Sequence, residues 1–223
     1  MTVFWILMAV AAVAASVDWT AVARSDPRLE YAAKPTVLVA LTAAAAVIPA
    51  GRIDLVERRW WFVAALGCCL VGDVLLMLPR HTFLPGLAAF LIGHVLFIVG
   101  LLQPPSPPGV PPFSFSTAGL LVAASAVVVT EAIPGSVLVR SLWHTGRRPL
   151  IGPVCLYVAA IATMVVIATN VGIPEAAAGA ALFLLSDTLL ALDRFVRPIP
   201  NGKLSVHATY HVAQGLLVLS LLH

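Results

Sequence analysis

The sequence is poor in charged side chains. Lys and Arg together number 13 and Asp and Glu number 10, which is 10% of the 223 residues. Soluble domains carry about 25% charged residues. Hydrophobic residues make up 61% of the chain, and the mean hydropathy is +1.01. This composition excludes a soluble globular enzyme and a disordered chain, and it indicates a membrane protein that retains few polar side chains.

Cysteine is scarce as well. Cys68, Cys69 and Cys155 all lie inside apolar runs, without Cys-X-X-Cys or Cys/His finger spacing. We expect them to be small buried hydrophobic residues. Basic residues are scattered singly and form no patch, so no nucleic-acid partner is expected.

Long apolar runs dominate the chain. They are continuous and do not alternate with polar residues, so they favour membrane-spanning helices over barrel strands. The first run lacks a basic leader and is interpreted as a span, not a signal peptide. We therefore expect an all-α fold, a polytopic transmembrane helical bundle of about eight helices in one integral membrane domain, residues 1–223. The eight runs are Thr2–Trp19, Tyr31–Ile48, Trp61–Leu78, Phe83–Leu102, Phe115–Ile133, Ile151–Val171, Ala176–Leu192 and Leu204–Leu222.

Loop charges predict the orientation. With eight spans, the odd-numbered loops share one side, which holds ten basic residues against three on the other. Cytoplasmic loops carry such an excess. We expect a multi-pass protein of a bacterial-type cell membrane with both termini outside, and a stiff proline-rich connection from Gln103 to Ser114. The ten are Arg24, Arg28, Lys34, Arg80, Arg140, Arg147, Arg148, Arg194, Arg197 and Lys203; the three are Arg52, Arg58 and Arg59.

Polar residues inside the spans gather near one membrane face. Asp73 and Asp187 each lie about five residues from the cytoplasmic end of their spans, or ~7–8 Å at 1.5 Å per residue. The opposite halves are almost wholly Ala, Val, Leu and Ile. An ionisable residue within a span is a candidate functional residue, so we predict a cavity open to the cytoplasm. The other polar residues of this leaflet are Lys34, His94, Tyr157, His207, Tyr210, His211 and Gln214.

A short internal echo accompanies the two aspartates. Asp73-Val74-Leu75-Leu76 matches Asp187-Thr188-Leu189-Leu190, 114 residues later, and a His follows each Asp in the next span. The echo is consistent with two four-helix halves in parallel.

Several short motifs resemble those of the YhhN-like family of membrane lysoplasmalogenases, over about Tyr31 to Gln214. The resemblance implies eight transmembrane helices and hydrolysis of the vinyl ether bond of lysoplasmalogens to a fatty aldehyde and a glycerophospho-alcohol. The matching motifs are Lys34-Pro35, Gly72-Asp73 with Leu75-Leu76-Met77, Gly93-His94, Tyr157 with Met164, Phe183 with Ser186-Asp187, and Tyr210 with Gln214.

Vinyl ether hydrolysis begins with proton transfer to carbon and passes through an oxocarbenium ion. One protonated carboxyl and one carboxylate in a poorly hydrated cavity suit that chemistry, as in glycoside hydrolysis. We expect Asp73 and Asp187 to form the pair, with His94 or His211 orienting water or moving the proton. No metal or other cofactor is expected. The partners are a lysophospholipid and the bilayer, and no oligomeric state is indicated. The expected substrate-binding residues are Lys34 for the phosphate, and Tyr157, Tyr210 and Gln214 for the glycerol backbone.

Three alternatives remain open. A metal-dependent membrane hydrolase could use zinc ligands from these spans, although no HExxH motif is present. A small-solute or proton-coupled transporter also fits intramembrane Asp and His residues, and so does a lipid-binding protein without chemistry. The ligands of the metal alternative would be Asp73, His94, Asp187, His207 and His211.

Overall fold

The structure is a computed structural model that describes residues 1–48, 53–78, 82–103, 117–128 and 133–223. The prolines of the predicted stiff connection, together with Arg52 and Arg80, lie outside the described residues.

The described part of the chain forms nine α-helices and no strand, which confirms the all-α prediction. Most helices begin or end within a few residues of the predicted runs. The helices are α1 (Thr2–Ala23), α2 (Pro27–Ala46), α3 (Ile53–Met77), α4 (Phe83–Leu102), α5 (Thr117–Val127), α6 (Ile133–His144), α7 (Ile151–Asn170), α8 (Pro174–Phe195) and α9 (Gly202–Leu219).

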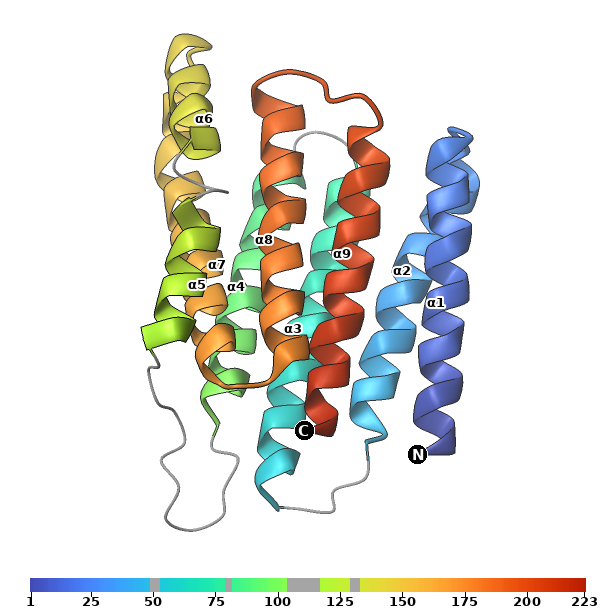
Figure 1. Ribbon diagram of the computed structural model, residues 1–223. Coiled ribbons are helices and arrows are strands. Elements are labelled where there is room, and N and C mark those ends of the chain that lie inside the picture. The colour runs from blue at the N-terminus through green and yellow to red at the C-terminus, as the bar shows by residue number, and fades with distance from the viewer. Residues whose placement is uncertain (49–52, 79–81, 104–116, 129–132) are drawn as a thin grey trace.

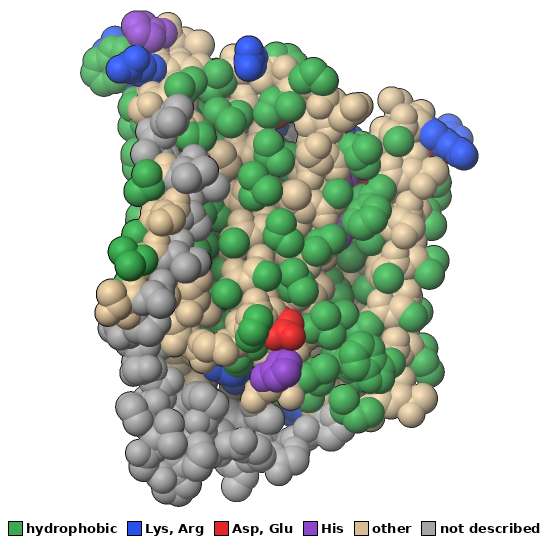
Figure 2. Space-filling view, viewed as in Figure 1, with side chains coloured by type: hydrophobic (Ala, Val, Ile, Leu, Met, Phe, Trp, Pro, Cys, Tyr) green, Lys and Arg blue, Asp and Glu red, His purple; other side chains and the backbone are tan. Residues whose placement is uncertain are grey.

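The helices run up and down in a bundle, and both termini lie at the same end of it (Figure 1). Five segments are long and apolar enough to cross a membrane: α1, α4, α8, Glu57–Met77 of α3 and Arg148–Asn170, which includes α7. Hydrophobic side chains cover the visible flank of the bundle, while charged groups gather near its ends (Figure 2). The protein is therefore a multi-pass membrane protein.

The fifth predicted span differs from the structure. In place of one helix over Phe115–Ile133, the chain forms the short helices α5 and α6. In Figure 1, α6 continues upward from α5 along the same edge of the bundle. Pro134 lies in the first turn of α6, where a missing backbone N–H is tolerated, so a new helix starts at that point.

The second half of the bundle repeats the contacts of the first. Helix α3 packs on α2 and α4, and α8 packs on α7 and α9; between the halves, α4 packs on α7 and α9 on α2. Glycines allow the two closest pairings. A Cβ on Gly93 of α4 would lie 2.9 Å from Cys69 Sγ, and one on Gly179 of α8 would lie 3.0 Å from the carbonyl oxygen of Ala213. Two four-helix halves remain a prediction from the sequence.

Candidate active site

The early start of α2 places Lys34 well inside the bundle. Asp26 caps this helix, because its side chain accepts hydrogen bonds from the backbone N–H groups of Arg28 and Leu29 at 3.1 and 3.2 Å. Pro27 is the first helical residue, a position that suits proline. The helix therefore begins a full turn earlier than predicted, and Lys34 is in its second turn, not at its start.

A cavity of about 400 Å³ lies at the end of the bundle opposite the termini (Figure 1). It opens among the last turns of α3 and α8 and the first turns of α2, α4 and α9. Apolar residues such as Leu87, Val158 and Ile161 form much of its wall. Five of the eight predicted site residues line it: Lys34, Asp73, Tyr157, Asp187 and Tyr210.

Both carboxylate oxygens of Asp73 have partners from other helices. Lys34 Nζ lies 3.0 Å from Oδ1, and the Tyr210 hydroxyl donates to Oδ2 at 2.9 Å. Only 1% of the Asp73 side chain is exposed. A buried carboxyl needs such partners, because burial without hydrogen bonds is costly. Helices α2, α3 and α9 thus meet at this side chain.

Asp187 is held in a similar way but is more open. The Tyr157 hydroxyl, on the neighbouring helix α7, donates to Asp187 Oδ2. His94 Nε2 lies 3.8 Å from the same oxygen, which is beyond hydrogen-bond distance. The Asp187 side chain is 15% exposed. Of the two carboxyls that line the cavity, Asp187 is therefore the more accessible to a molecule inside it.

His94 lies behind the cavity wall. It is fully buried, and its Nδ1 lies 2.7 Å from the carbonyl oxygen of Phe90, so Nδ1 carries a proton and donates it to that bond. Its Nε2 faces Asp187. His94 is thus a second neighbour of Asp187 from the other half of the bundle, as Tyr210 is of Asp73.

Aromatic rings pack around the side chains that neighbour the two carboxyls. Phe183 lies 4.6 Å from His94 and 5.4 Å from Tyr210 between ring centroids, and Phe90 lies 5.9 Å from Tyr210. His94 in turn lies 5.1 Å from Tyr157. These close ring contacts fix the positions of His94, Tyr157 and Tyr210 beside the carboxyls.

The structure does not bring the other predicted residues into the cavity wall. His211 and Gln214 are buried outside the described lining. The Trp19 indole N–H of α1 donates to His211 Nδ1 at 3.2 Å, so His211 lies at the α1–α9 contact. The donors of the metal alternative are likewise divided, and no group of three His, Cys, Asp or Glu suited to a metal occurs among the described residues.

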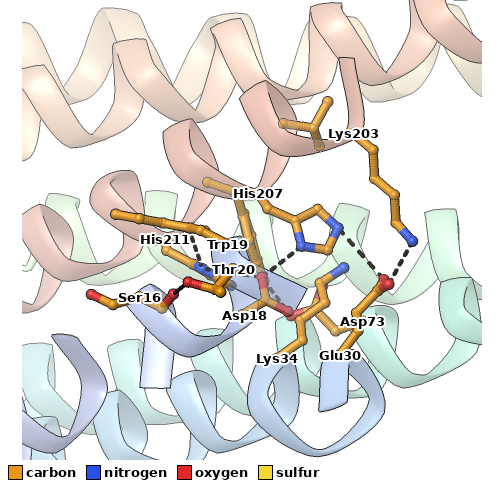
Figure 3. Close-up of polar contacts among 12 residues, drawn as sticks. Ser16, Asp18, Trp19, Thr20, Glu30, Lys34, Asp73, Lys203, His207 and His211 are labelled. Atoms are coloured by element: carbon orange, nitrogen blue, oxygen red, sulfur yellow. Dashed lines mark hydrogen bonds and ion pairs between the residues drawn. The ribbon is translucent and has the colours of Figure 1, made fainter. Parts of the chain in front are cut away.

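Sequence reasoning missed a polar cluster between α1, α2 and α9 (Figure 3). Asp18 is 0% exposed, and its Oδ2 lies 2.7 Å from His207 Nδ1. His207 Nε2 lies 4.0 Å from Glu30 Oε1, and Lys203 donates to Glu30 Oε2 at 2.6 Å. The sequence did contain a signal for this cluster, because Asp18 is an acidic residue within the apolar run Thr2–Trp19. The predicted first span ends at Trp19, whereas α1 continues to Ala23, so Asp18 lies more than a turn from the end of the helix.

The end of the bundle near the termini is less apolar than predicted. Arg58 is 2% exposed and donates to the carbonyl oxygens of Gly100 and Leu101, both at 3.3 Å. These carbonyls lie in the last turn of α4. The Gly100 carbonyl also accepts the capping hydrogen bond from the Gln103 N–H at 3.2 Å, and Arg58 adds a charged donor to both. The contact explains the buried cation as a structural one.

The sequence is similar to a family of known proteins. The family model of the YhhN family matches residues 29–221. Relatives named lysoplasmalogenase from Mycobacterium bovis and Mycobacterium tuberculosis are each 34% identical over 196 residues, which is 86% of this chain and 69% of the relative. Lysoplasmalogenase TMEM86B of Homo sapiens is 35% identical over 158 residues, 71% of this chain and 62% of the relative. No solved structure matches the chain.

The matched region contains α3, α4, α7, α8 and α9 and therefore both carboxyls of the cavity, whereas α1 precedes it. The match covers most of the chain, and the identity to the mycobacterial relatives extends over a similar share. The chain belongs to the YhhN family.

Proposed function

We propose that this protein is a lysoplasmalogenase, which hydrolyses the vinyl ether bond of a lysoplasmalogen to a fatty aldehyde and a glycerophospho-alcohol. The observation that carries the proposal is the carboxyl pair. Asp73 and Asp187 line one cavity, and each accepts a hydrogen bond from a tyrosine hydroxyl. The names of the relatives support the same activity.

The two carboxyls have different tasks in this proposal. Asp187 is the general acid that gives its proton to the vinyl carbon, because its side chain is 15% exposed, against 1% for Asp73. Asp73 is the carboxylate that stabilises the oxocarbenium ion through space. Its interaction with the Lys34 ammonium at 3.0 Å supports a negative charge at this position. General acid catalysis of this kind contributes roughly 10²–10⁴-fold to a rate.

The substrate would lie with its chain along the apolar wall and its headgroup at the rim. Lys34 had been assigned to the phosphate, but it contacts Asp73 instead. We therefore assign the phosphate to the rim cations Lys203, whose side chain is 60% exposed, and Arg194. Tyr157 and Tyr210, expected at the glycerol backbone, orient the carboxyls in this proposal.

We also propose that the cavity opens in the cytoplasmic leaflet. Two observations support this orientation: the excess of basic residues in the odd-numbered loops, and the position of both termini at the opposite end of the bundle (Figure 1).

A pair of incubations with two substrates tests the proposed function. Purified protein in detergent is given a lysoplasmalogen in one reaction and the matching ester lysophospholipid in another, and free aldehyde and free fatty acid are measured. We expect aldehyde from the first and neither product from the second. Fatty acid from the ester substrate, or no aldehyde from the vinyl ether, would refute the proposal.

A further inference from the structure

We propose that Asp18 and His207 form a catalytic dyad in which His207 Nε2 is the general base for the water that attacks the oxocarbenium ion. The inference rests on the proposed function and adds the second half of the reaction to it. It also gives α1, which precedes the residues matched by the family model, a part in the chemistry.

The geometry is that of a carboxylate that orients an imidazole. Asp18 Oδ2 lies 2.7 Å from His207 Nδ1, and both side chains are nearly or fully buried. A carboxylate in this position holds the Nδ1–H tautomer, which leaves the Nε2 lone pair free to accept a proton. His207 lines the same cavity as Asp187, and its Nε2 lies on the side of Glu30, another residue of the cavity lining.

The charged groups around His207 come from three helices. Asp18 on α1 faces Nδ1, and Glu30 on α2 lies 4.0 Å from Nε2, too far for a hydrogen bond. Lys34 on α2 and Lys203 on α9 are the nearby cations drawn in Figure 3. His211, one turn along α9, lies 6.0 Å away between ring centroids. A water between Nε2 and the substrate would thus lie in the polar part of the cavity.

Asp18 Oδ1 supports a role beyond helix packing. This atom is buried and has no hydrogen-bond partner within the described part of the chain. An incompletely paired carboxylate deep in a membrane protein is costly, which favours a functional reason for its presence. If the role of Asp18 were only to link α1 to α9, an uncharged Asn at this position could accept the same hydrogen bond from His207. The free-energy cost of burying Asn would be lower than that of burying a carboxylate.

The reaction has three steps. The Asp187 carboxyl gives its proton to the vinyl carbon, which leaves an oxocarbenium ion and a carboxylate. Water adds to the cationic carbon, the C=O π electrons return to the ether oxygen, and His207 Nε2 takes the released proton. The hemiacetal hydroxyl then gives its proton to the Asp187 carboxylate, the bond to the glycerol oxygen breaks, and His207 returns its proton to that oxygen.

The first test is the turnover of two variants with a lysoplasmalogen as substrate. Asp18→Asn keeps the shape and one hydrogen bond but loses the charge that fixes the tautomer, and His207→Gln removes the base. We expect kcat to fall roughly 10²–10⁴-fold in each, with KM within about threefold of wild type. The matched control is His144→Gln, at the exposed end of α6, which is expected to retain the wild-type kcat.

The second test separates catalysis from packing. Azide attacks an oxocarbenium ion without a base, so sodium azide should restore substrate consumption by His207→Ala at least tenfold and give the α-azido ether, detected by mass spectrometry. Wild type should not be accelerated, because carbon protonation limits its rate, whereas in the variants that lack the base the addition of water becomes the slow step. A purely structural role for His207 would show no rescue.

Failure of the dyad and failure of the proposed function give different results in these tests. Near wild-type kcat in both Asp18→Asn and His207→Gln, or a loss without an azide adduct, would overturn the dyad while leaving the lysoplasmalogenase proposal intact. Failure of the wild-type protein to release aldehyde would overturn the proposed function itself. A low kcat in the Asp18 and His207 variants, together with azide rescue of His207→Ala, supports both the dyad and the proposed function.

Discussion

Lys34 and Asp73 meet at 3.0 Å from two different helices, and only 10% and 1% of their side chains are exposed. Neither group could remain charged in this position without the other, because an isolated buried ion is strongly disfavoured. Tyr210 from α9 completes the contact, so one carboxyl ties three helices together at the wall of the cavity.

Lys34→Met should destabilise the protein by about 3–5 kcal/mol, because it leaves the buried Asp73 without its cation. The double variant Lys34→Met/Asp73→Asn should recover most of this loss, since no unpaired charge remains. Thermal unfolding in detergent measures both effects. If the double variant is as unstable as the single one, the ion pair is not the source of the destabilisation.

Asp187→Asn, and Asp73→Asn combined with Lys34→Met so that no buried charge is left unpaired, should each reduce aldehyde release from lysoplasmalogen by at least roughly 10²-fold, while the proteins still insert and purify. Asp26→Asn is the matched control: it caps α2 away from the carboxyl pair, and Asn is as good a cap as Asp. Near-normal activity in both cavity variants would show that the pair has no catalytic role.

Tyr157→Phe and Tyr210→Phe each remove one hydrogen bond to a carboxyl of the pair. A hydrogen bond to a charged group contributes about 1.5–3 kcal/mol, which corresponds to roughly 10–100-fold in rate. We expect the loss mainly in kcat, as measured by steady-state kinetics of aldehyde release. A rise in KM alone would instead place these hydroxyls on the substrate.

Gly179→Ala should separate α8 from α9, because the added Cβ would lie 3.0 Å from the Ala213 carbonyl oxygen, a backbone atom that cannot rotate away. Overpacking of this kind costs typically 1–3 kcal/mol. Gly215→Ala on α9 is the control, since nothing lies within 4 Å of its new Cβ. Equal melting temperatures for the two variants would contradict the close packing of α8 and α9.

A reporter fused to His223 should be inactive if it requires the cytoplasm, because the ten-to-three distribution of basic residues places the C-terminus outside. A second fusion in the loop before α7, at Gly146, should be active. The opposite pattern would reverse the orientation and place the cavity in the outer leaflet.

The depth of the site residues could be predicted from the sequence. Helical rise converts position in a span into distance from its end, so Lys34, Asp73, Tyr157, Asp187 and Tyr210 were expected in one leaflet, and the structure brings them to one cavity.

The side chain that each site residue contacts could not be predicted from the sequence. It depends on the rotation of each helix and on its neighbours, which apolar runs do not specify. Lys34 therefore contacts Asp73 instead of an open position, and His211 accepts a hydrogen bond from Trp19 of the first span. Asp18 was overlooked because helix α1 extends four residues past the predicted end at Trp19.

The cavity combines an apolar wall with a charged rim that includes Glu30, Arg194 and Lys203. Under the proposed reaction, this division sorts the two products by solubility. The long-chain aldehyde can pass from the wall into the surrounding lipid, whereas the glycerophospho-alcohol has lost its only anchor and diffuses from the rim into water. Cleavage would thus be driven forward by phase separation of its products, without a separate release step for either.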